Sequence, residues 1–273
     1  MSNLDVLEAA IKEIKNGRKA VIATIVKKTG SAPRDAGTKM LIREDGTTVG
    51  TIGGGSFEMM VWRDSMEALR EGKPIVKKYF FRKEATSGGA ETGLICGGEV
   101  EVYMDVLKPT PRIILIGAGH ISEAISKIVS MLGYRIVIVD SNPEFANKDR
   151  FPMAEQIFVS NDFRDWVDGV KPAESDLILI VYGEIEEDYK ALTSALKTHA
   201  RYIGLLGSRR KCAEFLRRLR GEGYKDEELL GRLYMPVGID IGADTPEEIS
   251  VAIVAEIIKI QRGGELKHLT LLK

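Results

Sequence analysis

Residues 112–140 read RIILIGAGHISEAISKIVSMLGYRIVIVD, and this stretch decides the fold of the C-terminal part of the chain. An apolar run, Ile113–Ile116, meets the turn Gly117-Ala118-Gly119, and apolar residues then recur at helical spacing. A second apolar run follows and ends on Asp140. The order strand, tight turn, helix, strand predicts the first half of a dinucleotide-binding fold.

Five residues around this turn are candidates for ligand binding. Gly117 permits the tight turn, Gly119 lets a ligand approach the backbone, and the helix start offers N–H groups to an anion. Asp140 stands where an acidic side chain accepts hydrogen bonds from a ribose diol. His120 either faces the nucleotide site or only begins the helix. Ser122 occupies the third glycine position, so the fingerprint is imperfect.

The rest of the C-terminal part continues the alternation of strands and helices. Predicted strands at 156–159, 176–182 and 201–206 are separated by helical segments such as 186–198. This spacing requires a parallel sheet with helices on both faces. The run Thr245-Pro246-Glu247-Glu248 is predicted to be a capping box that begins the last long helix.

The N-terminal part follows a different pattern. A helix is predicted over 4–16 and a buried strand over 19–26, and Asp45-Gly46 predicts a hairpin. Residues 99–106 alternate between apolar and polar side chains, as in a half-buried strand. The prolines of Lys108-Pro109-Thr110-Pro111 favour an extended linker.

The sequence therefore predicts an α/β protein of two domains. Residues 1–108 form an N-terminal α+β domain, and residues 109–273 form a C-terminal Rossmann-like domain with a doubly wound parallel sheet.

Composition excludes several classes of function. The 39 basic and 40 acidic residues give a net charge of −1, so no nucleic-acid-binding surface is expected. No apolar run approaches the roughly 18–20 residues that span a membrane, and no signal peptide is apparent. Two cysteines make no disulfide framework, and three separated histidines make no zinc pattern. We expect a soluble, cytoplasmic protein that binds neither nucleic acid nor membrane.

Three glycine turns share one pattern, in which an apolar strand ends in glycine and a helix begins. They are Gly53–Ser56, Gly117–Ser122 and Gly207–Arg210. Each turn offers backbone N–H groups to an anion. The alternative is that Gly53, Gly54 and Gly55 only allow a close turn, and that Ser208 is only an N-cap. Arg209 adds a positive charge that favours anion binding.

Two side chains in the N-terminal part are further candidates. Cys96 ends an apolar run before Gly97 and Gly98, which leave room for a ligand; its thiolate would be a nucleophile or a ligand for a soft metal. The alternative is a buried, inert cysteine. Arg34, in an irregular loop, can bind phosphate through two parallel hydrogen bonds.

No catalytic arrangement is apparent. The chain shows no Ser/His/Asp set, no paired acids and no cluster of metal ligands. It therefore offers a place to hold an anionic, nucleotide-like ligand without evident machinery to transform it, which favours a non-catalytic carrier over an enzyme.

Six segments, in order along nearly the whole chain, carry a resemblance to a known family. They are GSAPR (30–34), DGTTVGTIGGG (45–55), the Cys96-Gly97-Gly98 turn, ILIGAGHIS (114–122), YIGLLGSRR (202–210) and VGIDIGADTPEEISVAI (237–253). The chain resembles the XdhC/CoxI family, the maturation factors of xanthine dehydrogenase and related molybdenum hydroxylases.

The resemblance implies a specific function. Such a protein binds the molybdenum cofactor (molybdopterin), shields it while a cysteine desulfurase supports its sulfuration, and delivers it to a xanthine dehydrogenase-type hydroxylase. It also implies a homodimer. The phosphate of the pterin suits a glycine-lined helix N-terminus, and molybdenum suits a sulfur ligand such as Cys96.

Two departures from the family pattern bear on these expectations. Ser56 stands where relatives have a cysteine after the triple glycine, and a hydroxyl is a poor ligand for a soft metal, so Cys96 would have to provide the metal contact. Tyr182-Gly183-Glu184 replaces a Thr-His-Asp-like run. Two alternatives stay open: an NAD(P)-dependent oxidoreductase that uses Gly117, Gly119 and Asp140, and an interaction scaffold with a vestigial Rossmann site.

Overall fold

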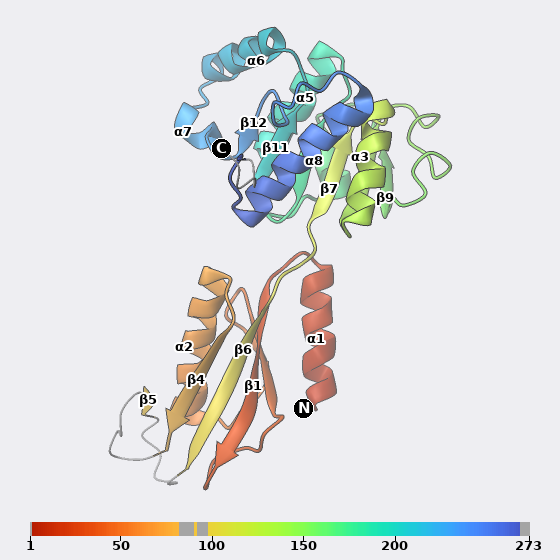
Figure 1. The fold of residues 1–273 in the computed structure, drawn as a ribbon. Helices are drawn as coiled ribbons and strands as arrows, with labels where there is room; N and C mark the ends of the chain where they lie inside the picture. Colours follow the sequence, from red (N-terminus) through yellow and green to blue (C-terminus); the bar gives the residue numbers. More distant parts are fainter. Residues whose placement is uncertain (1, 82–89, 92–97, 268–273) are drawn as a thin grey trace, which may run out of the picture. The chain divides into compact units, whose positions relative to one another are not determined.

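The computed structural model describes residues 2–81, 90–91 and 98–267. The chain divides into two compact units, one up to Pro109 and one from Thr110 onward (Figure 1).

The N-terminal unit is a mixed sheet with a helix on each face. Its elements are α1 (Asn3–Lys15), β1 (Ala20–Thr29), β2 (Lys39–Arg43), β3 (Thr48–Gly50), α2 (Gly55–Glu71), β4 (Ile75–Phe80), β5 (Ala90–Glu91) and β6 (Glu99–Leu107). The strand order is β3-β2-β1-β6-β4-β5, and all pairs are antiparallel except β4 with β5. The sheet lies between the two helices (Figure 1).

Alternation along β1 explains this layering. Val21, Ala23 and Ile25 are fully buried in the core beneath α2. Ala20 and Ile22 point to the other face, where they pack with Val6 and other residues of α1. A strand whose side chains alternate between two covered faces is apolar throughout, as the sequence predicted for this segment.

The C-terminal unit is a doubly wound sheet in which all strand pairs are parallel. Its elements are β7 (Arg112–Ile116), α3 (His120–Met131), β8 (Arg135–Asp140), β9 (Gln156–Val159), α4 (Trp166–Val170), β10 (Leu177–Ile180), α5 (Ile185–Leu196), β11 (Tyr202–Leu205), α6 (Arg209–Gly221), α7 (Asp226–Leu229), β12 (Leu233–Tyr234) and α8 (Pro246–Arg262). The strand order is β12-β11-β10-β7-β8-β9. The predicted α/β class and Rossmann-like domain are confirmed.

Two apolar layers cover this sheet. Ile113 and Leu115 of β7 pack toward α3 and α8, whereas Ile114 and Ile116 pack toward α4, α5 and α6. The predicted capping box begins α8: the Thr245 hydroxyl accepts a hydrogen bond from the Glu248 N–H at 3.2 Å, and Glu248 accepts one from the Thr245 N–H at 3.1 Å. Within the described ranges, no helix combines the length and apolar character needed to cross a bilayer.

The strand order places a topological switch point at β7. The chain runs outward from β7 to β8 and β9, and then crosses back to β10 on the other side of β7 and continues to β11 and β12. Ligands of open α/β sheets bind outside the carboxyl ends of the strands at such a point. The turns after β7, β8 and β10 are therefore the place to look for a site.

Candidate functional site

A cleft of about 370 Å³ lies at the switch point of the C-terminal unit. It is lined by Gly119, His120, Asp140, Asn142, Phe145, Arg150, Tyr182 and Glu184. These residues come from the end of β8 and from the segments that follow β7, β8 and β10, three neighbouring strands of the sheet.

The two glycines of the first turn have different physical reasons to be glycine. Gly117 has a φ of +105°, and a Cβ there would lie 2.5 Å from the Cα of Tyr182. Any side chain would therefore collide with the backbone that follows β10. Gly119 has an ordinary φ of −77°, and a Cβ there would meet no atom within 4 Å. The protein's own packing does not require glycine at position 119. A ligand that lies close to the backbone would require it, because a side chain would occupy the same space.

Asp140 holds this turn together from inside. Its side chain is only 3% exposed, one carboxylate oxygen accepts the Ala118 N–H at 2.6 Å, and the other accepts the Asn142 N–H at 2.8 Å. The ribose contact expected from the sequence stays a prediction. The role that the structure gives to Asp140 is to fix the turns after β7 and β8 relative to each other.

Ser122 lies inside the turn. It is 1% exposed, and its hydroxyl donates a hydrogen bond to the Gly117 carbonyl. The ligand contact expected of Ser122 stays a prediction; in this structure the side chain supports the glycine turn from behind. His120, by contrast, lines the cleft at the first position of α3.

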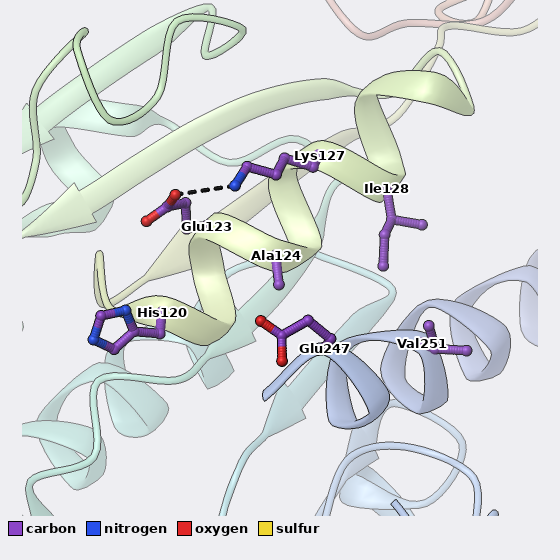
Figure 2. Close-up of a pocket in the computed structure, with 7 residues that line it drawn as sticks. All are labelled: His120, Glu123, Ala124, Lys127, Ile128, Glu247 and Val251. Carbon is purple, nitrogen blue, oxygen red and sulfur yellow. Dashed lines mark hydrogen bonds and ion pairs between the residues drawn. The ribbon is translucent and has the colours of Figure 1, made fainter. Parts of the chain in front are cut away.

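His120 also borders a second cavity. This cavity has a volume of about 310 Å³. Figure 2 shows its lining residues on α3 and α8, among which Glu123, Lys127 and Glu247 contribute charged groups. Hydrogen bonds, from Lys127 first and also from Arg150, lower the pKa of the Glu123 carboxyl. His120 thus lies where the switch-point cleft and this groove meet.

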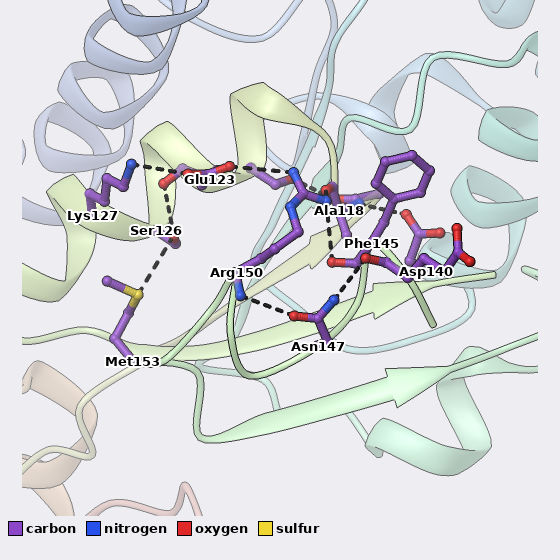
Figure 3. A network of polar contacts seen from close by, with 12 residues as sticks. Ala118, Glu123, Ser126, Lys127, Asp140, Phe145, Asn147, Arg150 and Met153 are labelled. Atoms are coloured by element: carbon purple, nitrogen blue, oxygen red, sulfur yellow. Dashed lines mark hydrogen bonds and ion pairs between the residues drawn. The ribbon is translucent and has the colours of Figure 1, made fainter. Parts of the chain in front are cut away.

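Arg150 is a cleft residue that the sequence did not reveal. It comes from the irregular segment between β8 and β9, and its guanidinium donates to the Ala118 carbonyl at 2.7 Å, the Phe145 carbonyl at 3.2 Å and Glu123 at 3.3 Å (Figure 3). An arginine in a segment without periodicity gives no sequence signal. Its importance follows only from the tertiary contacts.

A buried ion pair contacts the segment after β10, whose residues Tyr182 and Glu184 line the cleft. Asp188 of α5 is fully buried, pairs with Lys211 of α6 and accepts the Gly183 N–H at 3.2 Å. Lys211 also donates to the Leu206 carbonyl at 3.2 Å. Burial raises the pKa of the Asp188 carboxyl, against the lowering effect of Lys211 and the backbone N–H groups. The pair therefore ties together the turns that follow β10 and β11.

The third predicted turn does not join the cleft lining. The Ser208 hydroxyl accepts the Lys211 N–H at 3.2 Å, so Ser208 caps α6. Arg209 and Arg210 are exposed at the start of that helix. Neither Ser208 nor Arg209 is among the described residues that line the cleft.

In the N-terminal unit, the glycine turn before α2 is partly filled by the protein itself. The Glu58 carboxylate accepts the Ile52 N–H at 3.2 Å, the Gly54 N–H at 3.0 Å and the Thr51 hydroxyl. Gly54 and Gly55 have φ values of +74° and +65°, and a Cβ on either would meet open space. One of the N–H groups expected to bind an anion, that of Gly54, is thus already occupied by Glu58.

Three separate segments meet beside this turn. A Cβ on Gly53 would lie 2.7 Å from the Cβ of Pro33, and a Cβ on Gly98 would lie 2.2 Å from the Ser31 carbonyl oxygen. The 30–34 loop therefore packs against both the triple glycine and the start of β6. Arg34 is exposed on this loop.

The structure describes one of the two cysteines, Cys212, and not the other, Cys96. Cys96 lies outside the described residues, two positions before Gly98. Cys212 of α6 is 4% exposed in the core, and burial raises the pKa of its thiol, which disfavours the reactive thiolate. Across residues 2–81, 90–91 and 98–267, no group of three His, Cys, Asp or Glu side chains is placed to hold a metal ion.

Family models match both units of the chain. The model described as "XdhC Rossmann domain" matches residues 113–257, and the model described as "XdhC and CoxI family" matches residues 13–79. The chain belongs to the XdhC and CoxI family. Within this XdhC/CoxI protein, the matches cover the switch-point cleft and the 30–34 and 53–55 turns.

Relatives of this XdhC/CoxI protein have several descriptions. It is 38% identical over 257 residues to the uncharacterised protein YqeB of Escherichia coli (strain K12), covering 94% of this chain and 46% of YqeB. It is 26% identical over 161 residues to a probable xanthine dehydrogenase subunit of Bacillus subtilis (strain 168), covering 59% of this chain and 46% of that protein. The chain thus spans about half the length of these two relatives.

Two further likenesses cover most of the XdhC/CoxI chain. The molybdenum cofactor insertion chaperone PaoD of Escherichia coli (strain K12) is 20% identical in an alignment of 306 positions, which includes 95% of this chain and 89% of PaoD. A crystal structure described as a xanthine dehydrogenase from Bacillus halodurans is similar with a TM-score of 0.51 and 23% identity, over 97% of both chains. The latter likeness concerns the fold alone.

Proposed function

We propose that this protein is an accessory factor that binds molybdenum cofactor, supports its sulfuration and delivers it to a xanthine dehydrogenase-type molybdenum hydroxylase. The family membership and the descriptions of the Bacillus subtilis relative and of PaoD support this role. The sulfur donor in the proposal is a cysteine desulfurase, and the working form is a homodimer.

The observation that carries the proposal is the meeting of separate family segments at one turn of the N-terminal unit. Pro33 packs on Gly53 and Ser31 packs on Gly98, while Gly54 and Gly55 keep open space beside them. The open space beside Gly54 and Gly55 leaves room for the planar pterin, and the Arg34 guanidinium would bind its phosphate, with Ser56 as a polar neighbour. Cys96 would supply the sulfur ligand to molybdenum, because a soft metal prefers a thiolate to the Ser56 hydroxyl.

The experiment is to recover the cofactor from the protein itself. The chain is expressed in cells that synthesise molybdenum cofactor, purified, denatured and oxidised, and the fluorescent pterin product is measured. We expect pterin from the wild type and from Cys212→Ala, the matched control for loss of a thiol, and little from Cys96→Ala. Equal pterin from Cys96→Ala would contradict the role of Cys96.

A wild-type protein without pterin would contradict the carrier role as a whole. The switch-point cleft then favours the second candidate, an NAD(P)-dependent oxidoreductase that uses Gly119 and Asp140. Micromolar binding of NADH in a titration would support that alternative. The engagement of both Asp140 oxygens inside the protein counts against it.

A further inference from the structure

The outward face of α8 carries apolar side chains where a surface helix ordinarily carries polar ones. Val251 is 50% exposed, Ile258 is 38% exposed, and the half-buried Ala255 lies between them. Because an α-helix has 3.6 residues per turn, these positions share one face with Glu247 before them and Arg262 after them. These five residues form a stripe, the α8 stripe, which is apolar along its middle and charged at both ends.

The α8 stripe is complementary to itself about Ala255. Val251 stands four positions before Ala255 and Ile258 three positions after it, while the acidic Glu247 and the basic Arg262 stand about equally far out on either side. A second α8 laid antiparallel on the first therefore brings Val251 against Ile258 and Glu247 against Arg262. The small side chain of Ala255 lies at the centre, where it allows two helices to approach closely.

Both charged ends of the stripe are available to a second molecule. Glu247 and Arg262 are exposed, and neither forms an ion pair with another residue of the ranges 2–81, 90–91 and 98–267. The neighbouring Glu248, by contrast, is used by the capping box of α8. An acid in the first turn and a base in the last turn also suit the helix dipole. The dipole does not explain the exposed apolar side chains between them, whereas contact with a second helix does.

The groove between α3 and α8 offers a seat for this second helix. Figure 2 shows Ala124 and Ile128 of α3 facing Val251 of α8 across the groove, and all three side chains line it. In the antiparallel arrangement Ile258 of the second copy lies at the level of Val251, where it covers this apolar lining. Met131, one helical turn beyond Ile128, is 80% exposed and extends the apolar surface along α3.

We propose that the α8 stripe is the surface through which two copies of this chain associate. The two α8 helices lie antiparallel about a twofold axis at Ala255. Val251 packs on Ile258 of the second copy on both sides of the axis, and Glu247 forms an ion pair with Arg262 of the second copy at both ends. This inference rests on the proposed function, in which the working form is a homodimer, and names the interface of that dimer.

Sedimentation equilibrium of the full chain tests the proposal through a charge exchange. We expect the wild type to be a dimer. Glu247→Arg and Arg262→Glu each place like charges at both ends of the stripe, and each should weaken the dimer by about tenfold or more. An equal mixture of the two variants should associate with nearly the wild-type dissociation constant, because both ends of the mixed dimer again join opposite charges. A change in the fold of either variant would not be reversed by mixing.

A substitution in the apolar middle of the stripe gives a second test. Ile258→Asp places a charge in the buried centre of the interface and should leave a folded monomer at concentrations where the wild type is a dimer. Ile11→Asp is the matched control, since Ile11 is a 54% exposed apolar residue of α1 in the N-terminal unit, and it should keep the dimer. Thermal melting checks that each variant is folded.

Three results would overturn the proposed interface. They are a monomeric wild type, a dimer as tight in both charge variants as in the wild type, or no association in the equal mixture of the two folded variants. Pterin recovery from the same preparations separates this inference from the proposed function. Pterin in a monomeric wild type contradicts the interface and supports the carrier role. A dimer that responds to the charge exchange but holds no pterin supports the interface and contradicts the carrier role.

Discussion

The Asp140 carboxylate accepts a hydrogen bond of 2.6 Å from the backbone N–H of Ala118, 22 positions earlier in the chain. The bond joins the end of β8 to the glycine turn after β7, and the second carboxylate oxygen holds Asn142 at 2.8 Å. An acidic side chain at this position is expected to face a ribose. Here its first task is to give the cleft its shape.

The first prediction concerns the stability that Asp140 provides. Asp140→Ala should lower the free energy of unfolding of the C-terminal unit by about 3 kcal/mol, because the buried Ala118 N–H and the partly buried Asn142 N–H lose a charged acceptor. Urea unfolding followed by Trp166 fluorescence, in a Trp62→Phe background, measures this change. Glu144→Ala, at an exposed acidic position of the same segment, should change the free energy by less than about 0.5 kcal/mol. Equal stability of the two variants would contradict the structural role.

The second prediction separates the two glycines of the turn. Gly117→Ala should destabilise the unit by about 3 kcal/mol, because its Cβ would lie 2.5 Å from the Tyr182 Cα. Gly119→Ala should fold with a stability within about 1 kcal/mol of wild type, because its φ is ordinary and its surroundings are open. If the cleft binds NADH, Gly119→Ala should weaken that binding. Thermal melting and the NADH titration of the second candidate function measure the two effects, and a folded Gly119→Ala with full affinity for NADH would contradict the ligand role.

The sequence predicted the C-terminal fold well because local signals and tertiary structure agree there. The run from Ile113 to Asp140 carries strand, turn and helix periodicity in one continuous segment, and Thr245 begins α8 as its capping box predicted. Each of these features depends on neighbours within a few positions. Such features are readable without knowledge of the rest of the chain.

The candidate site was less predictable because it depends on partners far apart in sequence. Ser122 was expected to contact a ligand, yet its hydroxyl turns inward to Gly117. The Glu58 carboxylate accepts the Gly54 N–H, which the sequence motif alone would leave available to a ligand. The Arg150 guanidinium bonds to the carbonyl of Ala118, 32 positions earlier in the chain. A motif gives the residue types, but which group already satisfies which hydrogen bond is decided by tertiary packing.

The third prediction concerns the buried pair of Asp188 and Lys211. In Lys211→Met the carboxylate loses its cation, so the pKa of Asp188, already raised by burial, should rise further. A folded-state pKa above the unfolded value means that stability is fully present below about pH 4 and is lost as the pH rises through the folded-state pKa. Lys211→Met should therefore be destabilised by about 3 kcal/mol at pH 8 and much less at pH 4.

Urea unfolding at several pH values measures this dependence. The double variant Asp188→Asn with Lys211→Met is the control, because it removes both charges, and its stability difference from Lys211→Met should grow as the pH rises. The prediction would be wrong if the free energy of unfolding of Lys211→Met increased with pH relative to that of the double variant. Asp188 would then not be a buried, unpaired carboxylate in Lys211→Met.

The last prediction concerns Glu58 and the glycine turn of the N-terminal unit. Glu58→Ala should lower the free energy of unfolding by about 2 kcal/mol, because the Ile52 and Gly54 N–H groups lose their shared acceptor. Phosphate should then restore part of the loss, since a helix N-terminus with unpaired N–H groups binds anions. Urea unfolding followed by Trp62 fluorescence in a Trp166→Phe background, with and without phosphate at constant ionic strength, measures both effects.

Glu67→Ala, at an exposed position of the same helix, is the matched control. If phosphate stabilises wild type, Glu67→Ala and Glu58→Ala equally, the turn is not an anion site that Glu58 occupies.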